Sequence, residues 1–226
     1  MTKTMRAVRK LGPGPGAEVL EVPIPTIGPG EVLVKVEAAS ICGTDLHIWL
    51  WDEWSATRVK PPITMGHELA GTVVETGTGM EGAKVGDFVS AESHVTCGVC
   101  FQCRTGQAHM CPSTKILGVD RAGCFAEYVA VPEKVLWHTD RDKLPPEIAT
   151  LQEPFGNAVF SALANDLTGQ SGSSVPGSAF SGLKAALLHM GVIETDHVTA
   201  PFKPLSDEER GKIPGILAGL GLGDGR

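Results

Sequence analysis

Four cysteines lie in one short stretch of the chain. Cys97, Cys100, Cys103 and Cys111 follow one another at intervals of three, three and eight residues. Each Cys-x-x-Cys step can bring two thiolates to one side of a tight turn, and the longer interval lets the fourth sulfur return to the same point. Zinc bound by four thiolates at about 2.3 Å has no open position for chemistry. The spacing therefore predicts a structural zinc site.

Disulfides and an iron–sulfur cluster are the alternatives to zinc at these cysteines. Disulfides need an oxidising compartment, and the first residues carry no apolar signal segment. Ferredoxin clusters use related spacings, but the common ferredoxin runs differ in the last interval. Cys124 has no partner at ligand spacing, and its neighbours Gly123 and Phe125 suggest the start of a strand. We expect it to be a free, partly buried thiol.

A second group of residues has the chemistry of a catalytic metal site. Cys42, His67 and Glu68 supply a thiol, an imidazole and a carboxylate, which catalytic zinc uses while one position stays free for water or substrate. Thr44 and His47 follow Cys42 closely, and could carry a proton away from an alcohol bound at the metal. Taken singly, such residues are more often structural, because a buried cysteine packs as a small hydrophobe. Their combination, beside a four-cysteine loop, favours the catalytic interpretation.

The segments that must position these residues have the pattern of short strands. β-Branched residues and alternating polarity predict strands over Glu18–Ile24, Glu31–Glu37, Leu69–Glu75, Gly86–Ala91 and Phe125–Val131. The chain contains 28 glycines and 16 prolines, which favour many turns. We therefore expect a mainly β domain, a barrel or a sandwich, in place of alternating βα units.

Composition and charge exclude several classes of function. The net charge of −7 argues against a nucleic-acid partner, because phosphate binding depends on clustered Lys and Arg. A hydrophobic content of 42% is that of an ordinary globular protein, and no run approaches the length of a membrane span. We expect a cytoplasmic protein that acts on a small molecule, with no membrane partner.

Several motifs, in order, resemble the zinc-dependent medium-chain alcohol dehydrogenases. These motifs are Cys42–His47, Gly66–Gly71 and the four-cysteine loop. Further segments are similar to the L-threonine 3-dehydrogenase branch of that family: Ile48–Trp49, Glu92–His94, Lys115–Asp120 and Glu153–Ala158. The resemblance implies a GroES-like β-barrel catalytic domain over residues 1–158. It also implies oxidation of the secondary alcohol of L-threonine, with NAD as the hydride acceptor.

The resemblance further implies a role for each candidate residue. These roles are catalytic zinc binding for Cys42, His67 and Glu68, a carboxylate that approaches or exchanges at the metal for Glu153, and a proton relay for Thr44 and His47. The four-cysteine loop would hold a structural zinc. The chain would then bind two zinc ions.

The sequence departs from the family after Ala158. There the family continues into a Rossmann domain, whose phosphate turn needs G-x-G-x-x-G directly after a hydrophobic strand. The glycines of this chain have a different spacing, and Ser161–Ser174 has the composition of a loop or linker. A dinucleotide domain needs on the order of 100–150 residues, more than residues 159–226 provide. We expect no complete Rossmann domain and no cofactor-binding residues in this chain.

The remaining tail has helical signals. Ser181–Gly191 combines good helix formers with a glycine stop. Ser206 and Glu209 form a capping box, and Pro214 should kink or end the helix that follows. The stretch Leu183–Arg210 is similar to the C-terminal helices of dihydrodipicolinate synthase-like aldolases. None of that family's catalytic lysine or tyrosine motifs is present, so this likeness implies no lyase activity.

Three functions are compatible with these features. The first is a zinc- and NAD-dependent threonine-type dehydrogenase whose cofactor domain is absent or lies on another chain. The second is a non-catalytic zinc-binding GroES-like module, or a chimeric or truncated product. The third is an aldolase-like protein, for which we find no Schiff-base lysine. The family's missing strands would leave an open barrel edge, so a homo-oligomer is also among the expectations.

Overall fold

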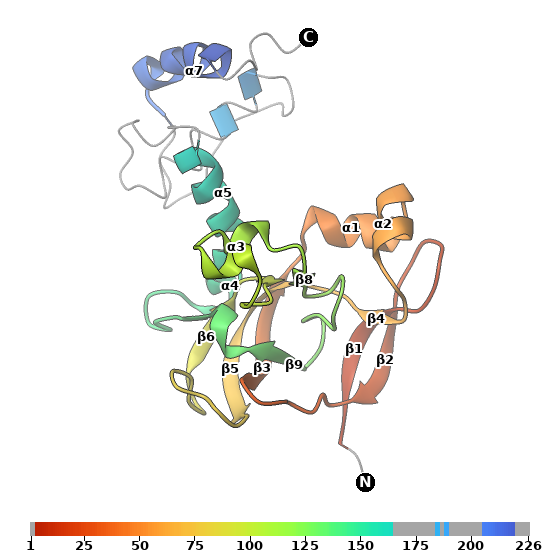
Figure 1. Ribbon diagram of the computed structural model, residues 1–226. Helices are drawn as coiled ribbons and strands as arrows, with labels where there is room; N and C mark the ends of the chain where they lie inside the picture. Colours follow the sequence, from red (N-terminus) through yellow and green to blue (C-terminus); the bar gives the residue numbers. More distant parts are fainter. Residues whose placement is uncertain (1–2, 165–183, 186–187, 190–204, 220–226) are drawn as a thin grey trace. The chain divides into compact units, whose positions relative to one another are not determined.

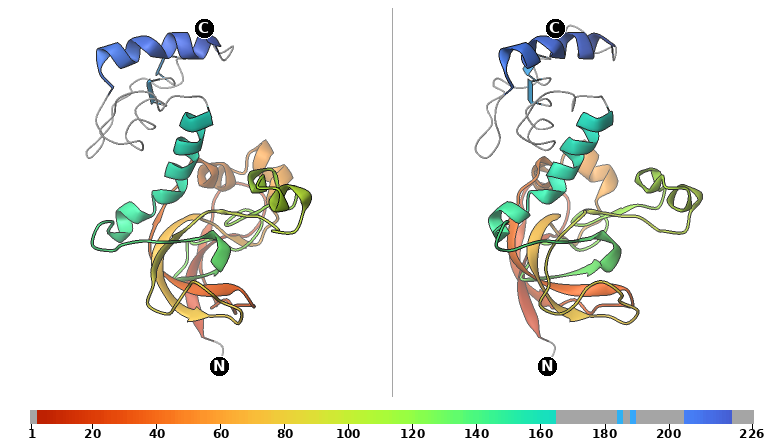
Figure 2. Two further views of the ribbon diagram at one scale, coloured as in Figure 1. Left: turned by 60° about the vertical axis from the view of Figure 1, so that its left-hand side comes forward. Right: turned by 90° about the vertical axis from the view of Figure 1, so that its left-hand side faces the viewer.

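Short antiparallel strands form the first part of the chain. The computed structural model describes residues 3–164, 184–185, 188–189 and 205–219. It divides into two units, Met1–Glu153 and Pro154–Arg226. All described strands lie in the first unit, and they curve around a common centre (Figures 1 and 2). The mainly β fold class predicted from the sequence is confirmed.

The strands pair in three sheets. Their bounds are β1 (Thr4–Lys10), β2 (Glu18–Pro23), β3 (Glu31–Ser40), β4 (Ile63–Thr64), β5 (Glu68–Thr76), β6 (Phe88–Ala91), β7 (His94–Val95), β8 (Lys115–Ile116), β9 (Tyr128–Pro132) and β10 (Leu136–His138). The sheet orders are β2-β1-β4, β10-β6-β5-β3-β9 and β7-β8. The central strands β3 and β5 are antiparallel, so the residues beyond the end of β3 lie beside the start of β5.

The first three described α-helices lie between strands, and the other three follow the last strand. Their bounds are α1 (Gly43–Leu50), α2 (Glu53–Arg58), α3 (Phe101–Arg104), α4 (Pro146–Ala149), α5 (Gln152–Ala164) and α7 (Asp207–Gly219). The segment that contains α3 projects from the barrel (Figure 2). Among the described residues, no helix is long and apolar enough to cross a membrane.

Valines from neighbouring strands fill the barrel core. Val32 and Val34 of β3 are fully buried, as are Val73 of β5 and Val131 of β9. Burying side chains of this kind contributes roughly 1.5–3 kcal/mol each. The β-branched runs that predicted the strands are thus the residues that hold the sheet together. All five predicted strands are present, with ends shifted by a few residues.

The first strand, β1, was missed by sequence analysis. Its burial alternates, and the inward positions carry Met5 and Ala7 among basic neighbours. Ala7 is too small to mark an apolar face, so the alternation is weak in the sequence. The strand is nevertheless paired along its length with β2, from Thr4 opposite Pro23 to Arg9 opposite Glu18.

A surface ion cluster joins β3 to the segment after β10. Both Arg141 amino groups donate to the carboxylate of Glu37, at 2.7 and 2.8 Å, and Thr72 Oγ1 donates to it at 2.6 Å. These bonds, that of Arg141 foremost, lower the pKa of Glu37 to about 2. The folded state therefore keeps Glu37 ionised at pH values at which the unfolded state protonates it.

This shift predicts a specific acid dependence of stability. The contribution of Glu37 should be fully present above its unfolded pKa of about 4.3 and should be lost as the pH falls through about 2. Urea midpoints between those pH values should fall more steeply for the wild type than for Glu37→Gln. Glu21→Gln, on β2, controls for the loss of a carboxylate. Equal slopes for the wild type and Glu37→Gln would contradict the prediction.

The second unit contains a small helical cluster. Ala185, Leu205, Ile213 and Leu217 are buried together. The predicted capping box is confirmed, because Ser206 N donates to Glu209 Oε2 at 2.8 Å and Glu209 N donates to Ser206 Oγ at 3.3 Å. An end of the helix at Pro214 is wrong, since α7 continues to Gly219. Proline removes one helical hydrogen bond, but burial of the flanking Ile213 and Leu217 favours continuation.

Part of the predicted tail lies outside the described residues. This holds for most of the helix Ser181–Gly191 and for the glycine-rich stretch after Asn165. Residues 161–164, assigned to a linker, belong instead to α5. Their sequence Ser-Ala-Leu-Ala has high helix propensity, which the linker interpretation overlooked. The expected domain boundary between Ala158 and Val159 falls within α5 and stays a prediction.

Candidate active site and metal centres

The four predicted cysteines converge on one point. The Sγ atoms of Cys97 and Cys103 lie 4.0 Å apart, and those of Cys100 and Cys111 lie 3.9 Å apart. A tetrahedron with metal–sulfur bonds of about 2.3 Å has edges of about 3.8 Å. A disulfide would bring two sulfurs to about 2.0 Å, and all six cysteines are free. The geometry fits a single four-coordinate ion such as zinc.

The pKa values of these thiols also favour the binding of a cation. The backbone N–H of Cys97 donates to Cys111 and lowers the pKa of that thiol to about 6. At Cys100 the N–H of Cys103 acts in the same direction, but loss of water and the neighbouring sulfurs raise the pKa to about 11. The neighbouring sulfurs therefore oppose ionisation of Cys100 unless a positive charge lies among them. Zinc would supply that charge.

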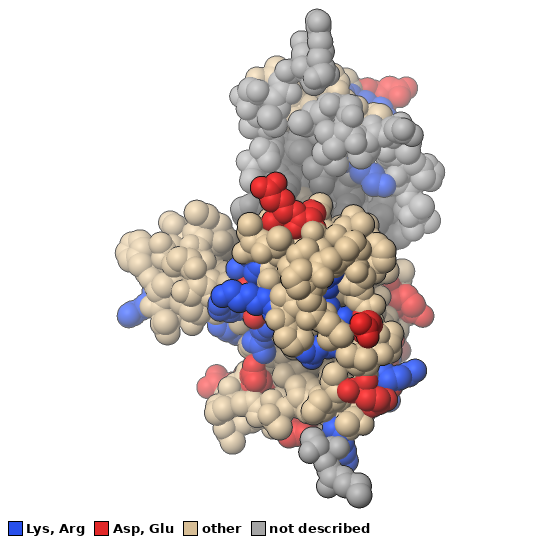
Figure 3. Space-filling model, turned by 90° about the vertical axis from the view of Figure 1, so that its right-hand side faces the viewer, with Lys and Arg blue, Asp and Glu red and all other residues tan. Residues whose placement is uncertain are grey.

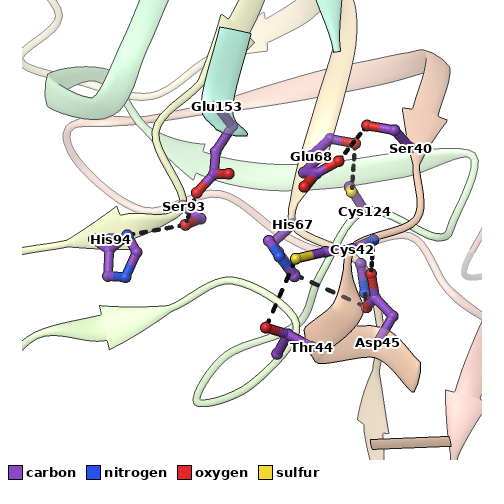
Figure 4. Close-up of polar contacts among 11 residues, drawn as sticks. Ser40, Cys42, Thr44, Asp45, His67, Glu68, Ser93, His94, Cys124 and Glu153 are labelled. Carbon is purple, nitrogen blue, oxygen red and sulfur yellow. Dashed lines mark hydrogen bonds and ion pairs between the residues drawn. The ribbon is translucent and has the colours of Figure 1, made fainter. Parts of the chain in front are cut away.

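The second ligand group is assembled by the pairing of β3 with β5. Ser40, the last residue of β3, lies opposite Glu68, the first residue of β5. The chain then enters α1, for which Cys42 is the N-cap residue. The ligand atoms of Cys42, His67 and Glu68 consequently lie within 4.8 Å of one another (Figure 4). Ser40 Oγ donates to the Glu68 carboxylate and holds it in this group.

The imidazole of His67 has an unsatisfied nitrogen. Its Nδ1 is buried without a hydrogen bond, and the nearest acidic oxygen, Asp45 Oδ1, is 3.9 Å away. A buried polar atom without a partner is costly. Zinc held by Cys42, His67 and Glu68 would give the imidazole a partner, so this donor set fits the ion.

Sequence analysis assigned no role to Asp45. The carboxylate accepts hydrogen bonds from Cys42 N at 3.0 Å and from Gly66 N at 3.2 Å, and it faces His67 (Figure 4). Burial raises its pKa, against those hydrogen bonds. Asp45 thus joins the two segments that carry the candidate ligands. Its position at N3 of the helix, as the acidic member of a capping box, was the available signal.

The sequence of this barrel matches a known family. The alcohol dehydrogenase GroES-like domain matches residues 28–141, which is half of the chain and includes both metal groups. The chain belongs to the zinc-containing medium-chain alcohol dehydrogenases.

Relatives in this dehydrogenase family agree with the assignment. The chain is 62% identical over 171 residues to the L-threonine 3-dehydrogenase of Symbiobacterium thermophilum, covering 76% of this chain and 48% of the relative. It is 57% identical to the L-threonine 3-dehydrogenase of Pyrococcus horikoshii, covering 76% of this chain and 49% of the relative. The chain therefore spans about half the length of these curated relatives.

Solved alcohol dehydrogenase structures share the fold. The 2R,3R-butanediol dehydrogenase of Bacillus subtilis aligns with a TM-score of 0.64 and 30% identity, over 80% of this chain and 55% of that structure. A cobalt- and zinc-bound thermostable alcohol dehydrogenase from Pyrobaculum aerophilum aligns with a TM-score of 0.63 and 32% identity, over 74% and 49%. In both, the alignment covers about half of the solved chain.

The two residues predicted as a relay lie on one helix of this dehydrogenase domain. Cys42 Sγ and Thr44 Oγ1 form a hydrogen bond at 3.7 Å, so the threonine hydroxyl lies beside the metal group. His47 comes one turn later on α1, with 59% of its side chain exposed and its Nδ1 2.5 Å from Asp52 Oδ2. No hydrogen bond joins Thr44 to His47 in the described part of the chain. One end of the predicted relay thus lies at the metal group, and the other in solvent.

Glu153 lies in a third group of possible metal ligands, together with Glu92 and His94. Ser93 Oγ donates to its Oε1 at 2.5 Å, and its ligand atoms lie within 4.8 Å of those of Glu92 and His94. Burial raises the pKa of Glu153. No metal-ligand group of the described residues combines Glu153 with Cys42, so its approach to the catalytic metal stays a prediction.

Cys124 differs from its prediction. The thiol is completely buried in the main core cluster instead of partly exposed, and it donates to the carbonyl oxygen of Glu68 at 3.6 Å. Burial raises its pKa well above the ordinary value. Backbone hydrogen bonds from residues 123–125 to the 64–66 segment hold Cys124 there, a long-range contact that the neighbouring residues do not reveal.

A buried lysine closes the end of α1. Lys10 is 1% exposed, and its Nζ donates to Gly16 O at 2.9 Å, to Trp49 O at 3.3 Å and to Gly14 O. Trp49 lies in the last turn of α1, where the carbonyl groups lack helical partners. Nζ also lies 5.1 Å from the centre of the Trp51 ring. Lys10 thereby ties β1 and the loop after it to the helix that carries Thr44.

Gly66 precedes His67 in a conformation that restricts substitution. Its φ is +90°, and a Cβ would lie 2.4 Å from the Phe125 ring. For Gly66→Ala we expect about 1–3 kcal/mol of backbone strain and a similar amount from displacing the ring, measured by urea unfolding. Gly79→Ala is the matched control, because its φ is +76° with no atom nearby, so it should lose only the first amount. Equal losses of stability in the two variants would contradict the close packing of Gly66 against the Phe125 ring.

Proposed function

We propose that this chain supplies the zinc-binding catalytic half of an NAD-dependent L-threonine 3-dehydrogenase that acts in the cytoplasm. Residues 1–158 would form the catalytic domain, and 159–226 a linker and helical tail. The observation that carries the proposal is the convergence of Cys42, His67 and Glu68 within 4.8 Å, with a buried imidazole nitrogen that lacks a partner. The 62% identity to a threonine dehydrogenase supports the choice of substrate.

The residues around this group have separate roles in the proposed alcohol oxidation. Zinc, when bound, supplies a Lewis acid that lowers the pKa of the substrate hydroxyl. Cys42, His67 and Glu68 would hold it. Asp45 fixes the two segments that carry them by accepting hydrogen bonds from Cys42 N and Gly66 N. Thr44 receives the hydroxyl proton, since its own hydroxyl lies beside Cys42. His47 would release a proton to water, because its side chain is largely exposed.

The hydride acceptor of the proposed reaction is NAD. NAD is expected from the family, whereas the sequence after Ala158 has no phosphate turn of the required spacing. That observation favours a second candidate, a zinc-binding GroES-like module without catalysis. The aldolase alternative rests on the tail alone.

Calorimetric titration of NAD⁺ into the zinc-loaded chain separates the two candidates. Saturable binding at micromolar concentration, followed by threonine-dependent formation of NADH that Thr44→Ala abolishes, is expected of a dehydrogenase that acts alone. No binding at millimolar NAD⁺ leaves the catalytic half as a module that needs a second chain. The proposal would fail if the chain bound no zinc at Cys42, His67 and Glu68.

A further inference from the structure

A hollow lined with basic side chains has none of the candidate metal ligands in its wall. Its volume is about 560 Å³, and its charged lining residues are Arg9, Lys115, Arg121, Glu31 and Asp120. Apolar side chains from β2 and β9, Val22 and Val129 among them, form part of its wall. Figure 3 shows Lys and Arg side chains gathered between the projecting lobe and the body of the barrel. Pockets for small ligands have volumes of roughly 300–1,000 Å³.

The acidic residues of the hollow are already paired. Glu31 Oε1 accepts from Arg121 at 2.7 Å, and Asp120 Oδ2 accepts from Arg58 at 2.7 Å. Neither Arg9 nor Lys115 forms an ion pair within the described ranges. Two positive charges therefore remain without a counter-charge in a chain whose net charge is −7.

The guanidinium of Arg9 is poorly satisfied. Its Nε is buried without a hydrogen-bond partner, and the contact of an amino group with Thr64 Oγ1 is long, at 3.4 Å. Arg6, three residues earlier on the same strand, instead pairs with Glu127 at 3.1 Å. A guanidinium carries five N–H donors, and its fork fits a phosphate with two parallel bonds. Glu18 lies opposite Arg9 on β2, but no ion pair joins them among the described residues. Arg9 thus has the donors of an anion-binding arginine and, within the described part of the chain, forms no ion pair with them.

We propose that this hollow binds a phosphomonoester with an apolar body. Two uncompensated cations, Arg9 and Lys115, match a phosphate group, which carries close to two negative charges at neutral pH. The apolar wall formed by β2 and β9 matches the body of the ligand. The hollow includes none of the candidate metal ligands, so the proposal does not depend on the chain's being a dehydrogenase.

The test uses phenyl phosphate, inorganic phosphate and phenol as probes of the full, zinc-loaded chain. Amide chemical shifts locate the binding, and calorimetry gives the affinity. We expect saturable binding of phenyl phosphate with shifts at Thr64, Lys115, Gly123 and Val129. Inorganic phosphate should bind there more weakly, since it lacks the apolar body, and phenol should not bind measurably. If inorganic phosphate bound as tightly as phenyl phosphate, the assignment of an apolar body to the ligand would be wrong.

Variants separate this hollow from the zinc sites, which can also attract phosphate. Arg9→Gln should weaken the binding of phenyl phosphate at least about tenfold, because the substitution removes a charge-assisted bidentate pair. Arg6→Gln, which removes the same charge from the same strand, should leave the affinity unchanged. Lys115→Gln, at an exposed position, gives a second variant if Arg9→Gln does not fold. The proposal is overturned if the wild type shows no saturable binding at millimolar concentration, or if Arg9→Gln and Lys115→Gln bind like Arg6→Gln.

Discussion

Cys103→Ala is expected to reduce the zinc content from two ions per chain to one and to unfold the loop from Cys97 to Cys111. This loop has little apolar core of its own, because Val99, Phe101 and Met110 are 76%, 74% and 62% exposed. Structural zinc contributes about 10–16 kcal/mol to folding in small zinc domains. Loss of one of four ligands should therefore remove most of what orders the loop. Elemental analysis and hydrogen exchange of residues 97–111 measure both effects.

Cys124→Ala is the matched control within the same chain. Cys124 is the sixth cysteine, buried in the barrel core and outside the four-cysteine group. Its replacement should leave a small cavity and both zinc ions. If Cys103→Ala retained two zinc ions and a protected loop, the assignment of a structural metal site would be wrong. Chelation of the wild type should reproduce the exchange pattern of Cys103→Ala at residues 97–111.

His67→Ala should remove the other zinc ion and leave the structural one. The change deletes one of three protein ligands, and Glu68 and Asp45, 4% and 2% exposed, remain buried near one another. Asp45→Asn should weaken zinc binding at this site by roughly 10- to 100-fold, the usual effect of losing a residue that positions the ligands. Competition with a chromogenic chelator gives both affinities.

His47→Asn provides the contrast for these two variants. His47 lies outside the ligand group and is largely exposed, so zinc affinity should be unchanged. Where threonine oxidation is measurable, its rate should fall in this variant at low pH more than at high pH, because hydroxide can accept the proton directly. A loss of zinc in His47→Asn would place His47 among the ligands and contradict the relay assignment.

The local part of this architecture could be predicted from the sequence. The four cysteines are close in sequence, so their spacing alone predicted that they share one site. The runs Glu31–Glu37 and Leu69–Glu75 were recognisable as strands, because β-branched residues face a core from both. Ligand chemistry grouped Cys42 with His67 and Glu68, and the resemblance to the alcohol dehydrogenases then assigned this group to a catalytic zinc.

Long-range contacts could not be predicted in the same way. The bond from Gly66 N to Asp45 depends on how β5 approaches α1, and α1 itself is too short for a clear helical period. The contact of Ser93 with Glu153 likewise joins distant segments. Arg9 and Arg6 are indistinguishable in the sequence, and only the fold shows that Arg6 forms an ion pair, with Glu127, whereas Arg9 forms none among the described residues.

The enclosure of Lys10 makes its amine a chemical reporter. Acylating reagents attack a neutral, accessible amine, whereas the Nζ of Lys10 is buried and donates to three carbonyl groups. Lys143, with 80% of its side chain exposed, should be modified at once. Modification of Lys10 must wait until the loop after β1 detaches from the end of α1. The ratio of the two labelling rates, measured by mass spectrometry, would therefore report how often this loop detaches from α1, the helix that carries Thr44 and His47.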